Sequence, residues 1–237
     1  MKTLRVIRSG IPDARETMVQ AVDRAWAAIA RPPDLVRRAA PDGQRVALSF
    51  DDGPSPANTA AVLDLLDEHD AKGTFFVVGS RIDGHEQILR RAARSGHELA
   101  NHTHSHVHTV HLSREELRRD LARANEAIAG AVHGIDAPVR LVRPPFGKDR
   151  RRTTLAAREL GLLTVLWSVD SGDARHFTVD EVISAVAGGA TPGSIVLMHD
   201  GGQRRDTTLT ALAALLPRLR AAGLQPVTVS ELLGLKR

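Results

Sequence analysis

Residues 48–54, Leu-Ser-Phe-Asp-Asp-Gly-Pro, join the end of an apolar run to two adjacent carboxylates. The stretch from Arg45 to Phe50 predicts a buried strand of a parallel sheet, because apolar and small side chains dominate it, and the glycine and proline end it. Neighbouring carboxylates repel each other unless a cation, a hydrogen-bond donor or water lies nearby. We therefore expect Asp51 and Asp52 to meet a positive partner at the C-terminal end of this strand.

The composition predicts a single domain. The chain has 237 residues, 42% of them hydrophobic, which is enough for one large core. Its 32 basic and 28 acidic residues are mixed and Tyr is absent, so we expect no nucleic-acid partner. The lack of cysteine excludes disulfides and thiolate zinc ligands. No apolar stretch has the length of a signal sequence or a membrane span, so we expect a cytoplasmic location and no membrane contact. We also expect no obligate protein partner.

Predicted strands and helices alternate from about residue 44 onward, after an amphipathic helix within residues 13–30. The predicted strands are 45–50, 74–78, 96–100, 139–142, 162–169, 194–198 and 225–229. The predicted helices are about 57–69, 85–95, 113–131, 153–160, 179–186, 209–222 and 231–233, and Pro217 is expected to kink or break the sixth. This alternation favours an α/β fold with a parallel sheet, most simply a barrel, whose chemistry would gather where the strands end.

The histidines are concentrated in one segment, since five of the 11 lie between His102 and His111. A histidine-rich surface loop would explain this cluster without any chemistry. His102 and His106 would share one face if the segment were helical, but His104 and His108 form a second pair with the same spacing. Two imidazoles and one carboxylate suit a divalent metal with open coordination positions. The spacing alone leaves open which pair would bind it.

Five short motifs follow one another along the chain, each at a predicted strand end. They are Ser49-Phe50-Asp51-Asp52-Gly53-Pro54, His102-Thr103-His104-Ser105-His106, Arg143-Pro144-Pro145-Phe146-Gly147, Trp167-Ser168-Val169-Asp170-Ser171-Gly172-Asp173 and Val196-Leu197-Met198-His199-Asp200. In this order they resemble the polysaccharide deacetylase family, the fourth carbohydrate esterase family, which includes the nodulation-type chitooligosaccharide deacetylases. The resemblance covers about residues 44–235. It implies a distorted (β/α) barrel of about seven parallel strands over residues 41–237, preceded by a helical extension, residues 1–40.

The resemblance also implies an activity, the hydrolysis of the acetamide group of an N-acetylated sugar. It assigns the metal to Asp52, His102 and His106, with Zn²⁺ favoured and Co²⁺, Ni²⁺ or Mn²⁺ as other candidates. Asp51 would act as the general base on water, and His199 would protonate the leaving amine as the general acid.

Further residues have supporting roles by the same resemblance. Arg143 would orient the general base and keep it ionised, and Asp170 would pair with the general acid. The backbone N–H of Phe146 would stabilise the oxyanion, and Leu197 would line a pocket for the acetate methyl group. The residues expected to contact substrate are Pro145, Phe146, Asp173 and Leu197.

One position departs from the family pattern, because Ala174 stands where the family usually has a tryptophan that walls the substrate groove. Phe146, Trp167 and Phe177 are the remaining aromatic candidates for such a wall, and Trp167 is expected in the core. We therefore expect a short soluble substrate, such as a chitooligosaccharide or a small aminosugar metabolite. The alternatives are a hydrolase of a non-sugar amide or cyclic imide, an O-acetyl esterase on an acetylated sugar, and a sugar-binding module without catalysis.

Overall fold

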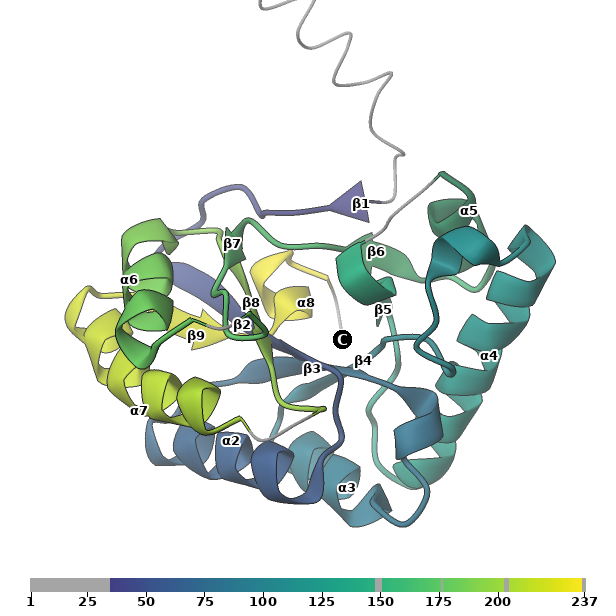
Figure 1. The fold of residues 1–237 in the computed structure, drawn as a ribbon, viewed down its shortest axis with the longest axis horizontal. Coiled ribbons are helices and arrows are strands. Elements are labelled where there is room, and N and C mark those ends of the chain that lie inside the picture. The colour runs from purple at the N-terminus through teal and green to yellow at the C-terminus, as the bar shows by residue number, and fades with distance from the viewer. Residues whose placement is uncertain (1–34, 148–150, 176, 203–204, 236–237) are drawn as a thin grey trace, which may run out of the picture. The chain divides into compact units, whose positions relative to one another are not determined.

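A parallel sheet of nine strands organises the residues that the computed structural model describes, which are 35–147, 151–175, 177–202 and 205–235 (Figure 1). The strands are β1 (Leu35–Val36), β2 (Arg45–Asp51), β3 (Gly73–Val77), β4 (Glu98–Asn101), β5 (Leu141–Val142), β6 (Leu163–Val165), β7 (Val169–Asp170), β8 (Ile195–His199) and β9 (Gln225–Val227). Their order is β1-β6-β5-β4-β3-β2-β8-β7, and β9 pairs with β2. The predicted α/β class with parallel strands is confirmed.

Helices cover the outside of this sheet in Figure 1. They are α2 (Pro56–Glu68), α3 (Glu86–Arg94), α4 (Arg114–Ala131), α5 (Arg151–Glu159), α6 (Val179–Gly189) and α7 (Asp206–Ala221). The short α8 (Val229–Leu232) instead packs on the inner side of the sheet, where Val229 and Leu232 join the cluster that contains Ala47 and Phe76. The 3₁₀ turns are Gly79–Arg81, Thr109–His111 and Pro145–Gly147. The predicted helix at 13–30 lies outside the described residues. Leu35 and Val36, which fall in the predicted N-terminal extension, pair in the sheet with β6. Within the described residues, none of the helices is both long and apolar enough for a membrane span.

The sheet curls into a distorted barrel, and residues 163–170 connect its two sides. They form two short strands, β6 and β7, that pair at different places in the sheet. The expected strand 162–169 is split, so that β6 pairs with β5 whereas β7 pairs with β8. Between them, the Leu166 N–H donates to the Val36 carbonyl at 2.8 Å and the Ser168 N–H donates to the Ile195 carbonyl at 3.0 Å. A single chain segment therefore bridges the two halves of the sheet.

The alternation of side chains along β2 separates the core from the site. Val46, Leu48 and Phe50 belong to the large apolar cluster that includes buried side chains of α2 and α7, whereas Ala47 belongs to a second cluster with Phe76. Because successive strand residues point to opposite faces, Asp51 lies on the same side as Ala47. Asp51 is therefore directed into the barrel, and only 4% of its surface is exposed to solvent.

Pro217 was expected to kink or break this helix, and the break is absent, since α7 continues to Ala221. A proline removes the hydrogen bond to the carbonyl four residues earlier, which here belongs to Ala213. Both residues are exposed, so water can solvate that carbonyl. The buried Leu215, Leu216 and Leu219 hold the last turns of the helix against the sheet.

Candidate active site

The candidate catalytic residues come from the C-terminal ends of four parallel strands. Asp51 is the last residue of β2 and His199 the last of β8, while His102 directly follows β4 and Arg143 directly follows β5. Because these strands run in the same direction, their C-terminal ends meet at one rim of the barrel. The fold thus brings side chains from opposite ends of the sequence to one place.

Asp52, His102 and His106 form a compact cluster at this rim. The distance from Asp52 Oδ1 is 3.4 Å to His102 Nε2 and 2.8 Å to His106 Nε2, and the three ligand atoms lie within 4.8 Å of one another. Burial opposes ionisation of Asp52, but hydrogen bonds to the two imidazoles outweigh it and hold the pKa of this carboxyl well below its usual range. A carboxylate and two imidazole nitrogens aimed at one point can bind a divalent cation.

The segment 102–108 is not helical, so the condition under which His102 and His106 would share one helical face is not met. Thr103 and His106 have positive φ angles of 68° and 54°. The segment is held instead by side chains: Asn101 Oδ1 accepts from the Thr103 N–H at 2.7 Å, and Thr103 Oγ1 accepts from the His106 N–H at 3.0 Å. Asp52 and Phe146 also have positive φ, at 75° and 61°. Such strained conformations gather at functional sites.

The geometry distinguishes the two histidine pairs that spacing left open. His104 lies apart from the cluster, with its Nδ1 buried beside Gly79, and His108 stacks on the Phe146 ring. Within the described parts of the chain, only the set Asp52, His102 and His106 has the arrangement of a metal-binding group. The structure brings the predicted triad together and leaves the second pair outside it.

His102 is oriented as a metal ligand would be. Its Nδ1 lies 2.7 Å from the backbone carbonyl of Arg143, an acceptor, so this nitrogen carries the proton. Nε2 is then the nitrogen with the free lone pair, and it faces Asp52. Ligating histidines commonly donate their other ring N–H to a carbonyl, which fixes the tautomer and the ring. The residues present therefore fit a divalent ion.

Arg143 is fully buried and anchors Asp51. Its Nη1 donates to Asp51 Oδ1 at 2.6 Å, and its Nε and Nη2 donate to the carbonyls of Val165 and Leu166, each at 3.2 Å. The guanidinium lies over the Phe76 ring, 3.9 Å from its centroid. Burial lowers the pKa of Arg143 and the Asp51 charge opposes that shift. Asp51 Oδ2 remains directed toward the site, 3.7 Å from His102 Nε2.

Asp173 is the partner of His199, so the predicted pairing of Asp170 with His199 is wrong. Asp173 Oδ1 lies 2.8 Å from His199 Nδ1, and its Oδ2 accepts from the His199 backbone N–H and from Thr208 Oγ1, both at 2.8 Å. Burial disfavours the imidazolium, but the hydrogen bond and charge of Asp173 outweigh it and raise the pKa of His199. The same contacts lower the pKa of Asp173 against its burial.

The backbone turn after β7 explains why Asp173, and not Asp170, contacts His199. Asp170 Oδ1 accepts from the Gly172 N–H at 2.9 Å, and the other oxygen pairs with Arg175 at 3.0 Å. Gly172 has φ 77°, which turns the chain so that Asp173 returns to β8. The Asp173 side chain is 0% exposed, so the prediction that it contacts substrate is also wrong.

The other predicted substrate-contacting residues border the same rim. Leu197 lies two residues before His199 on β8 and is 4% exposed. Pro145 is buried, whereas Phe146 is 52% exposed and its ring centroid lies 5.1 Å from that of His106. Trp167 is partly buried against the cluster that contains Phe76, as expected for a core residue.

Asp200 is a site residue that sequence reasoning missed. It is fully buried, it accepts from Thr59 Oγ1 at 2.6 Å, and its Oδ1 has no hydrogen-bond partner. A Cβ on Gly53 would lie only 2.4 Å from its Oδ2. Burial raises the pKa of Asp200 to about 7, and the charges of Asp52 and Asp51 add to this shift. Its place directly after His199 in the fifth motif was the only signal in the sequence.

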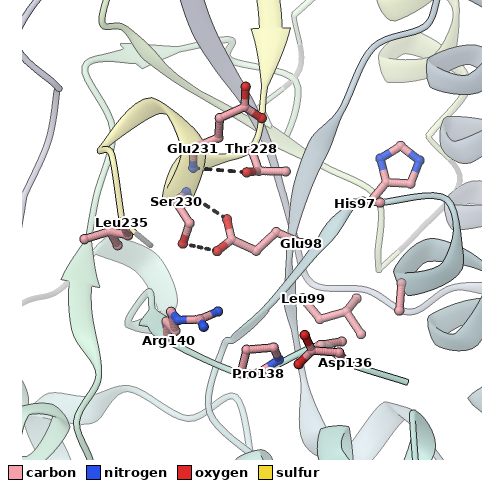
Figure 2. A pocket seen from close by; sticks show the side chains of 13 residues that line it. His97, Glu98, Leu99, Asp136, Pro138, Arg140, Thr228, Ser230, Glu231 and Leu235 are labelled. Carbon is pink, nitrogen blue, oxygen red and sulfur yellow. Dashed lines mark hydrogen bonds between the residues drawn. The ribbon is translucent and has the colours of Figure 1, made fainter. Parts of the chain in front are cut away.

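A hollow of about 270 Å³, drawn in Figure 2, has no candidate catalytic residue in its lining. It is lined by residues at the start of β4 and around α8, among them Glu98, Arg140 and Ser230. Glu98 is the first residue of β4, whereas His102 follows the last, so the hollow faces the opposite end of the strands. Both Glu98 oxygens are bonded, to Ser230 and to Thr74. The lining of the hollow includes no residue of the candidate metal cluster.

The fold and the site together define a class of protein. It is a parallel, distorted (β/α) barrel with two histidines and one aspartate at the C-terminal rim, flanked by an Arg-held aspartate and an Asp-held histidine. This donor set leaves coordination positions open, as a hydrolytic metal site requires.

Comparison with known proteins identifies the family. A family model described as polysaccharide deacetylase matches residues 38–165. The chain is 37% identical over 208 residues to a peptidoglycan-N-acetylglucosamine deacetylase of Bacillus cereus, covering 86% of this chain and 96% of the relative. It is also 37% identical over 198 residues to a chitooligosaccharide deacetylase of Sinorhizobium fredii, covering 79% and 91%. The chain belongs to the polysaccharide deacetylase family.

Solved structures agree with this membership. A crystal structure of a peptidoglycan N-acetylglucosamine deacetylase superposes with a TM-score of 0.81 at 28% identity, covering 90% of this chain and 97% of the other. A pseudoenzyme of carbohydrate esterase family 4 from Bacillus anthracis superposes with a TM-score of 0.78 at 28% identity, covering 87% and 71%. Because one of these neighbours is a pseudoenzyme, catalysis has to be argued from this chain's own site residues.

Proposed function

We propose that this protein is a metal-dependent N-deacetylase that hydrolyses the acetamide of a short N-acetylated sugar, a chitooligosaccharide or a small aminosugar metabolite, to an amine and acetate. The observation that carries the proposal is the convergence of the Asp52, His102 and His106 cluster with a candidate base, Asp51, and a candidate acid, His199, at one rim. The names of the relatives support it, since both describe deacetylases of N-acetylated sugars.

The triad would hold the ion, and we propose Zn²⁺, which accepts mixed imidazole and carboxylate ligands. When bound, a divalent ion supplies a Lewis acid that makes water a better nucleophile near neutral pH and polarises the acetyl carbonyl. Co²⁺, Ni²⁺ and Mn²⁺ are alternatives that metal analysis of the purified protein would separate. The predicted cytoplasmic location stays a prediction.

The side chains around the triad would move the protons. Asp51 accepts the proton of the attacking water at its free oxygen, while Arg143 holds the other oxygen in place. His199 carries a proton toward the leaving nitrogen, because Asp173 raises its pKa and fixes the ring through Nδ1. Nε2 is then the nitrogen that donates. The N–H of Phe146 and the side chain of Leu197 would contact the acetyl group.

The proposal is tested by measuring acetate and free amine released from N-acetylglucosamine and its oligomers by metal-loaded protein. Asp51→Asn keeps an oxygen to accept from Arg143 but removes the base, so we expect a rate loss of about 100- to 10,000-fold. Asp136→Asn, an exposed acid at the opposite end of the strands, is the matched control and should retain the wild-type rate.

Three results would reject the proposal. Acetate release that survives Asp51→Asn would exclude Asp51 as the base, and release of a product other than acetate from a non-sugar amide would identify a different hydrolase. Wild-type protein that binds metal but turns over no acetamido sugar would place the chain with the inactive members of the family.

A further inference from the structure

Three large apolar side chains are exposed among the described residues, Val107 at 42%, Phe146 at 52% and Phe177 at 37%. They lie in the segments that follow β4, β5 and β7, so all three are at the rim that carries the metal cluster. Exposed apolar side chains that gather at one place mark a surface that binds a ligand.

The Phe146 ring is held in place by two histidines. Its backbone has φ 61°, a left-handed conformation that aromatic residues rarely adopt. The His108 ring stacks on it with centroids 3.9 Å apart and planes 20° apart, and the His106 ring lies 5.1 Å away at 60°. The exposed ring is therefore in contact with a candidate metal ligand and with a second imidazole.

His108 has no part in the reaction proposed above. It lies outside the metal-binding group, and its ring contacts are with Phe146 and with the edge of His111, 5.9 Å away. It is exposed, so the fold does not need it as a core residue. Its stacking on Phe146 is what remains to be explained.

A sugar ring is a suitable occupant for the exposed part of Phe146. A pyranose has an apolar face of C–H groups, and burying that face against an aromatic ring removes apolar area from water on both sides. Because the Phe146 ring lies against His106, a sugar on it would be next to one whose acetyl group reaches the metal cluster. A monosaccharide would leave this surface unused.

We propose that His108 is a positioning residue that fixes the Phe146 ring as a platform for the sugar adjacent to the one that is deacetylated. The inference rests on the proposed function and adds to it a residue that acts on the binding of oligosaccharides. His108 acts through Phe146 and touches neither the reacting amide nor the ion.

The test compares His108→Ala with His108→Phe, which restores a ring at the stacking position. For the trimer of N-acetylglucosamine, His108→Ala should raise KM by about 2- to 12-fold with kcat nearly unchanged, the range that one aromatic pair supports. His108→Phe should return KM to the wild-type value. KM for 4-nitrophenyl acetate, which has no second ring, should be the same in all variants, and His133→Ala is the matched control for loss of an exposed histidine.

A titration without turnover separates this inference from the proposed function. In the Asp51→Asn background, the Kd of the trimer should rise by the same factor when His108 is replaced by Ala. An unchanged KM and Kd in His108→Ala would overturn the platform, as would an equal loss on the trimer and on the small ester. Absence of both turnover and trimer binding in protein that has an intact His108 would overturn the proposed function itself.

Discussion

Replacing Asp173 by Asn should impair the reaction far more than replacing Asp170 by Asn. Asp173 accepts hydrogen bonds from His199 Nδ1, from the His199 backbone N–H and from Thr208 at 2.8 Å each, and from Ser171 at 2.9 Å. An Asn side chain has one acceptor oxygen and no charge, so it cannot satisfy both donors of His199. The variant keeps the shape of the site and removes the ionic partner of the proposed acid.

The magnitude follows from the contact that is lost. A buried hydrogen bond to a charged group contributes about 1.5–3 kcal/mol, so kcat should fall about 10- to 150-fold. Asp173 raises the pKa of His199, and without it the imidazole loses its proton at a lower pH. The alkaline limb of the kcat profile should therefore move to lower pH.

The assay is the initial rate of acetate release as a function of pH for both variants. Asp170→Asn removes an exposed ion pair with Arg175, which is worth at most about 1 kcal/mol, so it should change kcat by less than about fivefold. If Asp170→Asn shifted the alkaline limb and Asp173→Asn did not, the assignment of Asp173 as the partner of His199 would be refuted.

Two further predictions concern metal binding and stability. Asp52→Asn should lose the bound divalent ion on dialysis while retaining its fold. Metal analysis would check the ion content and circular dichroism the fold. A metal content equal to that of the wild type would contradict the assignment of Asp52 as a metal ligand. Burial raises the pKa of Asp200 from 3.8 to about 7, so the native state keeps a proton that the unfolded chain releases. Metal-free protein should accordingly lose about 4 kcal/mol of unfolding free energy as pH rises through this interval, and no more above it. Asp200→Asn should remove that loss in urea titrations across the pH range, and an unchanged slope would show that another group is responsible.

The fold could be predicted largely because its signals are local. An apolar run ended by Gly53 and Pro54 describes a strand whatever surrounds it, and Ser113 followed by Glu116 forms the capping box that begins α4. The division of residues 162–169 into β6 and β7 could not be predicted, because it depends on which neighbours each half finds across the barrel.

The site was predictable in its residue types and less so in its contacts. The motifs named the aspartate and histidines of the metal cluster, but a helical spacing argument could not find the left-handed residues Thr103 and His106 that bring the imidazoles together. The choice between Asp170 and Asp173 depends on the turn at Gly172, and the burial of Asp200 depends on packing against Gly53.

The sequence by itself determined that this chain alternates strands and helices and that its acids and imidazoles follow strand ends, because hydrophobic pattern and turn residues act over a few positions. Only the tertiary structure decided which carboxylate holds His199, which histidine pair meets Asp52 and which aromatic ring stays exposed beside it. These contacts join residues far apart in the chain, and their geometry follows from strand register and loop conformation, which no local pattern encodes.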